Sequence, residues 1–545
     1  MIDLSGLPIL TLITFTPLVG AIVIAFLPRE RLSWIRWAAL GTALVAWALS
    51  LLLLTAFNPE ESGFQFGEVA DWVPAFGIQY KLGVDGISLA LVVLTTTLTW
   101  ISILASFGPI KERVKEYMIS FLILEVGMTG VFLGLDMFLF YIFWELVLIP
   151  MYLIIGIWGG ANRIYATIKF VLYTLVGSLL MLVAILAMAY TYQSATGSWV
   201  GAFDYLTLHE FGFDPTLQFF AFAAFFLAFA IKVPMFPFHT WLPDAHVEAP
   251  TPISMILAGV LLKLGGYGII RICYPICPQA GYDLAYFVCG LGVLSMIYGA
   301  FAALAQKDFK RLVAYSSVSH MGYVVLGIGV WSLGMWVVGE NKFNPDAWKM
   351  GVNGAMFQMI GHGISSPGMF FMVGVVYDRV HHRNLNQFGG LFARMPIYSG
   401  LAIGIFFAGL GLPGLCGFIG EVFVTLSVWN FNHALAVISA SVVILTAAYI
   451  LWTLQRVYLG PEYRGPHGDH LTPMTGRELA IAAPLLALAI VFGVYPQAIF
   501  RYMTPSVDRT VDELTAWTEN VKARRPVEET ALAPSLTTNE VATQQ

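Results

Sequence analysis

Charged residues are scarce in this sequence. Asp, Glu, Lys and Arg make up 11% of the 545 residues, whereas hydrophobic residues make up 58%, and the mean hydropathy is +0.76. A soluble domain needs more charge to cover its surface, so the composition excludes a soluble fold and indicates a polytopic helical membrane protein. The net charge of −5 also excludes a nucleic-acid partner.

Cysteine is equally rare. Cys273, Cys277, Cys289 and Cys416 lie in or beside apolar stretches and lack the spacing of iron–sulfur or zinc ligands. We interpret them as buried, unreactive thiols, and we expect neither a metal site nor a redox cofactor in this chain. The first apolar stretch, 7–27, lacks the basic segment and cleavage site of a signal peptide, so we expect a retained helix.

Long apolar runs, by contrast, are abundant. A helix needs about 20 apolar residues to cross a bilayer, and fourteen stretches meet that length. The sequence therefore predicts an all-α polytopic membrane protein, with one membrane domain over 1–500 and a polar, loosely ordered tail over 501–545. The predicted helices 1 to 14 are 7–27, 34–56, 86–107, 117–135, 137–157, 165–191, 217–238, 252–271, 283–305, 311–330, 353–376, 397–430, 433–456 and 478–499.

Two of these helices contain helix-breaking residues beside a charge. In helix 7, Pro234 and Pro237 follow Lys232, and in helix 12, Pro413 and its neighbouring glycines precede Glu421. Proline removes a backbone donor and clashes with the preceding turn, so we expect both helices to be broken. The simpler interpretation is a pair of ordinary proline kinks.

The two predicted breaks lie five helices apart. Paired discontinuous helices at corresponding positions are typical of transporters built from internal repeats. The spacing predicts two five-helix repeats, 113–272 (helices 4–8) and 281–457 (helices 9–13). Because five is odd and successive helices alternate in direction, the repeats would be inverted.

The distribution of Lys and Arg predicts the orientation. The loops after helices 1, 3, 5, 9, 11 and 13 carry sixteen of these residues, whereas the opposite loops carry four. Cytoplasmic loops carry an excess of Lys and Arg. We therefore expect a multi-pass protein of the inner (plasma) membrane with both termini in the periplasm.

Four ionisable residues lie inside membrane-spanning stretches: Glu145, Lys232, Lys263 and Glu421. Each costs roughly 2.5–3.5 kcal/mol near the bilayer centre unless it pairs or reaches water. Burial lowers the pKa of a lysine and raises that of a carboxyl group, so such groups can exchange protons. The set therefore indicates a proton relay. The alternative is a static ion pair between Glu145 and a lysine of helix 7 or 8.

Histidines extend this set. His320 on helix 10 and His362 on helix 11 lie deep in apolar segments and can both donate and accept a proton. His239 and His246 flank the broken part of helix 7 and are predicted to lie near its cytoplasmic mouth. Glu125 on helix 4 is a further buried acid and a minor candidate.

Several long motifs stand out along the chain. They are GVDGIS at 83–88, FWELVLIP at 143–150, KVPMFPFHTWLPDAH at 232–246, APTPIS at 249–254, LKLGGY at 262–267, AYSSVSHMG at 314–322 and VYDRVH at 376–381. They resemble the antiporter-like subunits of respiratory complex I and, among these, the M-type subunits of NADH:quinone oxidoreductases, the counterparts of mitochondrial subunit 4. The resemblance covers nearly the whole chain.

The resemblance implies a fourteen-helix fold with two inverted repeats and a role for each buried charge. Glu145 matches the helix-5 glutamate that pairs with the helix-7 lysine, here Lys232, and Lys263 matches the central lysine of helix 8. Glu421 stands where sister subunits have a lysine, which favours the M type. One departure from the family pattern is Pro367.

The implied function is proton translocation coupled to quinone reduction. Protons would enter from the cytoplasm near the helix 7–8 connection, pass Lys232, Lys263, His320 and His362, and leave by Glu421. NADH, FMN, Fe–S clusters and quinone would lie in partner subunits, with L-like and N-like subunits and a peripheral redox arm as partners. Two alternatives remain: a subunit of an Mrp-type cation/proton antiporter, and a charge-paired structural scaffold.

Overall fold

The computed structural model describes residues 6–333, 345–463 and 465–532. In this part of the chain, thirteen helical crossings are long and apolar enough to span a membrane, and two shorter apolar helices follow one another along the chain. The crossings are α1 (Ile9–Phe26), α2 (Leu32–Ala56), α3 (Gly86–Ser106), α4 (Val114–Leu133), α5 (Met137–Trp158), α6 (Arg163–Thr196), α8 (Pro215–Lys232), α10 to α12 (Thr251–Ile276), α14 (Ala285–Leu304), α15 (Phe309–Leu333), α16 (Pro345–Val380), α20 (His433–Val457) and α21 (Gly476–Val494). This confirms the all-α polytopic class.

Both predicted helix breaks are present. The helix α8 ends at Lys232, and after a non-helical stretch the chain resumes as α9 (Trp241–Glu248). The indole N–H of Trp241 donates to the carbonyl of Ile231 at 2.8 Å, which satisfies a backbone group freed by the break. Likewise, α18 (Pro396–Leu410) and α19 (Cys416–Trp429) are the two short apolar helices, and they stand where one crossing was predicted.

The eighth predicted crossing is continuous but irregular. Its α-helical parts α10 (Thr251–Ile256), α11 (Leu262–Gly268) and α12 (Tyr274–Ile276) are joined by two π-helical stretches, Leu257–Leu261 and Ile269–Cys273. Wider π turns often occur at functional sites. Lys263 is the second residue after the first of them.

Burial divides the crossings into a centre and a periphery. The most apolar stretches of α16 and of the α10–α12 crossing are 100% buried, whereas those of α2, α20 and α21 are 33% buried. Pro367 lies inside α16, which remains one helix from Pro345 to Val380. The elements that carry Lys263 and His362 are therefore at the centre of the bundle.

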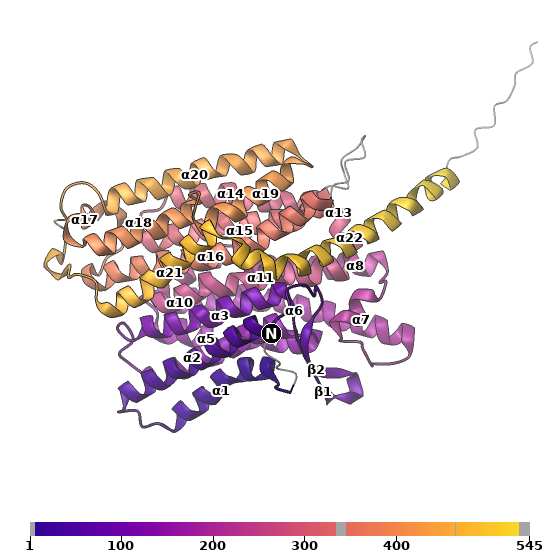
Figure 1. Ribbon diagram of the computed structural model, residues 1–545, viewed down its shortest axis with the longest axis horizontal. Helices are drawn as coiled ribbons and strands as arrows, with labels where there is room; N and C mark the ends of the chain where they lie inside the picture. Colours follow the sequence, from indigo (N-terminus) through magenta and orange to yellow (C-terminus); the bar gives the residue numbers. More distant parts are fainter. Residues whose placement is uncertain (1–5, 334–344, 464, 533–545) are drawn as a thin grey trace, which may run out of the picture.

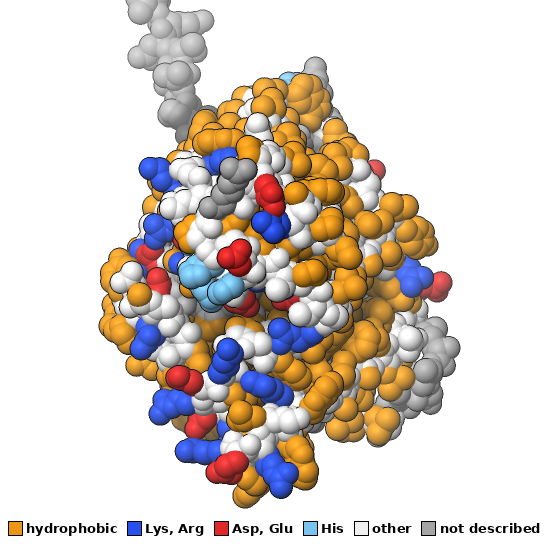
Figure 2. All heavy atoms as spheres, turned by 90° about the vertical axis from the view of Figure 1, so that its left-hand side faces the viewer, with side chains coloured by type: hydrophobic (Ala, Val, Ile, Leu, Met, Phe, Trp, Pro, Cys, Tyr) orange, Lys and Arg blue, Asp and Glu red, His pale blue; other side chains and the backbone are white. Residues whose placement is uncertain are grey.

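Cationic side chains are spread across one end of the bundle. Figure 2 shows this end, which is at the left in Figure 1, with Lys and Arg spread across it. It includes the short helix α17 (Leu391–Arg394), and we call it the basic face. At the opposite end lie a hairpin that the sequence analysis did not predict, β1 (Gln65–Val73) and β2 (Ile78–Val84), and α7 (Tyr205–Glu210). The remaining short elements are α13 (Pro278–Asp283) and the 3-10 turns Pro74–Phe76, Leu385–Gln387 and Gly468–His470.

The segment after Arg501 corrects a prediction. We expected a loosely ordered tail from 501, but α22 (Gln497–Leu532) is a long helix that begins against the bundle and projects from it (Figure 1). Met503, Val507, Val511 and Leu514 are buried, and their spacing of three to four residues forms one apolar stripe. The charged residues between them hid that stripe. Residues 533–545 of the predicted tail lie outside the described residues.

Candidate proton-relay site

Lys263 and His362 are in direct contact at the centre of the bundle. The Nζ atom of Lys263 lies 2.6 Å from Nδ1 of His362 and 2.5 Å from the carbonyl oxygen of Ala258. Both side chains are buried. An ammonium group only donates hydrogen bonds, so with Lys263 charged, His362 accepts at Nδ1 and carries its own proton on Nε2. The pair can therefore receive a proton at one end and release one at the other.

His320 and Glu421 form the second contact. Nδ1 of His320 lies 3.0 Å from Oε1 of Glu421, and both side chains are buried. The hydroxyl of Tyr449 lies 3.4 Å from the other ring nitrogen of His320. The ring of His320 is 5.8 Å from that of His362, centroid to centroid. Lys263, His362, His320 and Glu421 therefore form one file of side chains, which we call the central axis.

Four elements distant in the sequence supply this axis. Lys263 comes from α11, His362 from α16, His320 from α15 and Glu421 from α19. Glu421 reaches the axis from the first turns of α19, directly after the break between α18 and α19. At the break, Gly411 adopts a φ of +79°, and an added Cβ would lie 2.6 Å from the Glu421 carboxylate. The break between α18 and α19 thus positions the Glu421 carboxylate at the central axis.

Lys232 and Glu145, which the family resemblance pairs, are not in direct contact. The ammonium of Lys232 is buried against two rings, 5.4 Å from the centroid of Trp144 and 5.7 Å from that of Phe170. Oε1 of Glu145 is buried, with no hydrogen-bond partner among the described residues. No ion pair within 4.0 Å joins the two in the described part of the chain. The direct Glu145–Lys232 contact that the family resemblance implies is not formed, and Lys232 makes cation–π contacts instead.

Three other predicted residues stand apart from the axis. His246 stacks on Phe370 with ring centroids 4.3 Å apart, and His239 packs against Tyr298 at 4.8 Å. Within residues 6–333, 345–463 and 465–532, neither ring nitrogen of His239 or His246, and neither carboxylate oxygen of Glu125, has a hydrogen-bond partner. The structure therefore does not join them to the axis by direct contacts.

Sequence reasoning missed Lys310. Its Nζ donates to the carbonyl oxygen of Ala249 at 2.5 Å, and its side chain is only 4% exposed. It lines a cavity of about 670 Å³ at the basic face, together with Glu248 and Asp378. Lys310 is one of the sixteen Lys and Arg residues that the sequence analysis assigns to loops, here the loop after helix 9. Its spacing of three, four and seven residues from Val313, Ala314 and Ser317, all buried, was the available signal for an inward-facing position.

Comparisons with known proteins identify the family. The transmembrane family described as NADH:quinone oxidoreductase/Mrp antiporter matches residues 134–446. The subunit M of NADH-quinone oxidoreductase from Rhodobacter capsulatus is 45% identical over 93% of this chain and 97% of its own length. The chain belongs to the M-subunit family.

Solved structures agree with this membership. A chain of respiratory complex I from Thermus thermophilus matches with a TM-score of 0.81 at 28% identity, over 93% of this chain and 99% of that chain. A chain of the Mrp complex from Dietzia shares the fold, with a TM-score of 0.76 at 21% identity over 95% and 100% of the two chains. The M-subunit family thus fits the chain over nearly its full length.

The potential metal ligands and the cysteines were located in the described residues. In the residues that the structure describes, no group of three or more His, Cys, Asp and Glu side chains is arranged to hold a metal ion. Cys273, Cys277, Cys289 and Cys416 are free and buried.

Proposed function

We propose that this chain is the proton-translocating, antiporter-like M subunit of an NADH:quinone oxidoreductase. The central axis carries the proposal. It contains two contacting pairs of titratable side chains in the most buried part of a membrane protein. Lys263 lies 2.6 Å from His362, and His320 lies 3.0 Å from Glu421. Charged groups cost free energy in that environment and are retained where they conduct or switch. Protons would pass from Lys263 through His362 and His320 to Glu421.

The cavity at the basic face is the proposed inlet. Its opening lies beside the connection between α9 and α10, where the sequence analysis placed proton entry. Lys310 stands at its inner wall and donates to the carbonyl of Ala249, three residues beyond His246. We propose that a proton moves from this cavity through Lys310 and then His246 to Lys263. His239 would lie near the entrance of the same inlet. Glu125 remains a minor candidate.

Lys232 and Glu145 are the proposed switch. With the two charges apart, the carboxylate stabilises the ammonium less, so Lys232 releases its proton more readily towards the axis. The rings of Trp144 and Phe170 hold the lysine in this separated arrangement. Movement of either side chain towards the other would reverse the effect.

Redox chemistry in partner subunits would drive the cycle. We propose that NADH, FMN, Fe–S clusters and quinone bind there, and that L-like and N-like subunits and a peripheral arm assemble with this chain. We place it in the inner membrane with the basic face in the cytoplasm and both termini in the periplasm. The breaks support the repeats 113–272 and 281–457 within a membrane domain of 1–500.

Replacing Lys263 by Ala in the assembled complex tests the proposal. The variant should assemble but lose NADH-driven proton pumping in inverted vesicles by about a hundredfold, the usual contribution of a positioned proton-transfer group. Lys115→Ala is the matched control, because Lys115 also donates to backbone carbonyls but lies at the edge of the bundle. Normal pumping in an assembled Lys263→Ala complex would contradict the proton relay, and a structural scaffold would be the remaining interpretation.

An Mrp-type antiporter subunit is the second candidate. The likeness to the Dietzia Mrp complex favours it, although at 21% identity this likeness concerns the fold. Copurification separates the two. Flavin and Fe–S subunits that copurify with the chain support the oxidoreductase, whereas a set of small membrane subunits without redox centres supports the antiporter.

A further inference from the structure

The break between α18 and α19 lies in the middle of its membrane crossing. The helix α18 has 15 residues and α19 has 14, so at 1.5 Å per residue the break is about 22 Å and about 21 Å from the two ends. The hydrocarbon core of a bilayer is about 30 Å thick. A Cβ added at Gly361, the neighbour of His362 in the sequence, would lie 2.9 Å from the carbonyl oxygen of Cys416. The break is therefore level with the central axis.

The backbone of this break is exposed and partly unpaired. Leu412 is 40% exposed, Pro413 and Gly414 are exposed too, and a Cβ added at Gly414 would meet no atom within 4 Å. Among the described residues, the carbonyl of Pro413 and the N–H of Gly414 have no hydrogen-bond partner. Lipid tails cannot supply one. Irregular backbone is tolerated at this depth only where protein covers it or where it lines a water-filled cavity.

A second irregular segment lies beside the break. The helices α21 and α22 meet in a non-helical turn after Val494, and a Cβ added at Gly493 would lie 2.3 Å from Cα of Leu415. Val494 and Tyr495 are 71% and 57% exposed. Residues 412–414, 494 and 495 thus form one exposed surface at the level of the central axis, which we call the broken-helix patch.

The break after α8 is different, because this chain satisfies it. The N–H of Met235 donates to the carbonyl of Ala230 at 2.7 Å, and the N–H of Phe236 donates to the hydroxyl of Ser295 on α14 at 2.9 Å. The two breaks of one chain therefore have different requirements. The broken-helix patch needs partners from outside the described chain.

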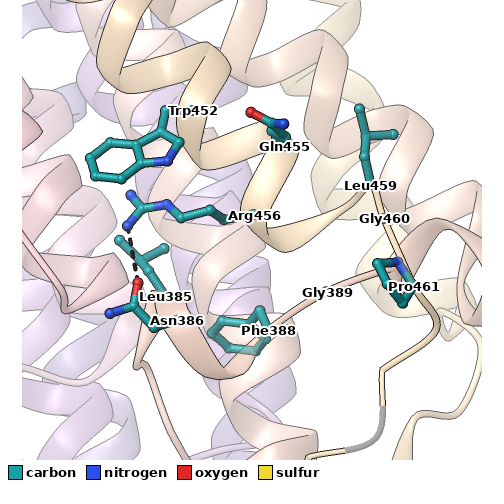
Figure 3. Close-up of a pocket in the computed structure, with 10 residues that line it drawn as sticks. All are labelled: Leu385, Asn386, Phe388, Gly389, Trp452, Gln455, Arg456, Leu459, Gly460 and Pro461. Atoms are coloured by element: carbon teal, nitrogen blue, oxygen red, sulfur yellow. Dashed lines mark hydrogen bonds between the residues drawn. The ribbon is translucent and has the colours of Figure 1, made fainter.

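Irregular segments at the ends of the bundle have access to water. Residues 385–389 and 459–461 flank a hollow at the basic face, where Arg456 donates to Asn386, the dashed line in Figure 3. Backbone groups at this level can bond to water, so such loops require no protein partner. The broken-helix patch differs from them in its depth.

We propose that the broken-helix patch is the surface on which a second membrane subunit docks, through a membrane-spanning helix that carries hydroxyl or amide side chains. Such side chains can donate to the carbonyl of Pro413 and accept from the N–H of Gly414, and they commonly bond across helices in membranes. The contact would also cover one end of the axis, since a Cβ added at Gly411 would lie 2.6 Å from the Glu421 carboxylate. The proposal is independent of the proton route and requires only that the chain spans a membrane.

Photo-crosslinking in the assembled complex, in its membrane, tests the docking surface. The photoreactive p-benzoylphenylalanine (Bpa) is placed at position 412. Ultraviolet light should join Leu412→Bpa to another membrane subunit, seen on a gel as a shift by the mass of that subunit. Val176→Bpa is the matched control, because Val176 is 56% exposed and lies about 20 Å into the unbroken helix α6. It should label lipid and give no such shift.

Val494→Bpa is a second test of the same patch and does not require the first variant to assemble. It should give an adduct with the same subunit. An assembled complex in which neither position crosslinks to protein would overturn the proposal. So would reaction of Leu412→Cys with a water-soluble maleimide in the assembled complex, because the patch would then line a water-filled crevice. The four native cysteines are buried, so they should give little background.

Discussion

The chemistry of the central axis depends on single contacts. Lys263 meets His362 at 2.6 Å and His320 meets Glu421 at 3.0 Å, while the two histidine rings stand 5.8 Å apart. A proton can cross each contact directly, but it needs a ring movement or an intervening water between the histidines. The gap between His320 and His362 is therefore the point at which conduction can be interrupted.

Replacing Glu421 by Gln should stop conduction at the far end of the axis. The amide of Gln cannot take up a proton from His320, whereas the carboxylate of Glu421 can. NADH-driven pumping should fall about tenfold or more, because a positioned proton acceptor is lost. Glu116→Gln is the control, since Glu116 pairs with Arg29 in an exposed position. Unchanged pumping in Glu421→Gln vesicles would exclude this exit.

Replacing Lys310 by Met tests the inlet. Methionine keeps most of the volume but neither donates to Ala249 nor carries a proton. Pumping should slow by about tenfold while the complex still assembles, because the relay remains but its supply is restricted. Lys115→Met provides the control for loss of a lysine at the same face. If Lys310→Met vesicles pump at the normal rate, protons enter elsewhere.

The broken helices are the elements that bring charges to the axis. The break between α18 and α19 relies on Gly411, whose φ of +79° disfavours any residue with a Cβ. Gly411→Ala should destabilise this element by about 1–2 kcal/mol and push the Glu421 carboxylate from its place. Gly400→Ala, in the regular part of α18 with no neighbour within 4 Å, should be neutral or stabilising.

Thermal denaturation of the purified complex, together with pumping, measures this difference between glycines. Gly411→Ala should lower both the melting temperature and the pumping rate, and Gly400→Ala neither. A Gly411→Ala complex with normal pumping would show that the break does not position the acid.

The two ends of the bundle carry different features in the described part of the chain. Cationic side chains gather at the basic face, and the hairpin of β1 and β2 lies at the other end (Figures 1 and 2). Because cytoplasmic loops are enriched in Lys and Arg, we predict that Phe392→Cys faces the cytoplasm and Val69→Cys the periplasm. Both native side chains are exposed, and the four native cysteines are buried.

Labelling with a membrane-impermeant maleimide checks the orientation. Val69→Cys should react in intact spheroplasts, and Phe392→Cys only in inverted vesicles. The buried native thiols should give little background. The opposite pattern would place the termini in the cytoplasm and reverse the proposed direction of proton entry.

Local signals predicted the membrane class, both helix breaks and the charged residues of the axis. They failed where tertiary contacts decide. Charged residues lie between the apolar residues of α22, so its apolar stripe becomes apparent only where it packs against the bundle. Lys310 follows a short loop in the sequence, and only the packing of α15 shows that its side chain points inward. The expected contact of Glu145 with Lys232 is replaced by contacts of the lysine with two rings, which depend on the packing of α5, α6 and α8.

The sequence by itself determined that this chain spans a membrane many times and carries charges where they are costly, because hydropathy and helix-breaking residues act over a few neighbouring positions. Only the tertiary structure decided which charges meet. Lys263 and His362 are 99 positions apart, and His320 and Glu421 are 101 apart. Contacts at such separations follow from how helices pack, and no local pattern contains that information.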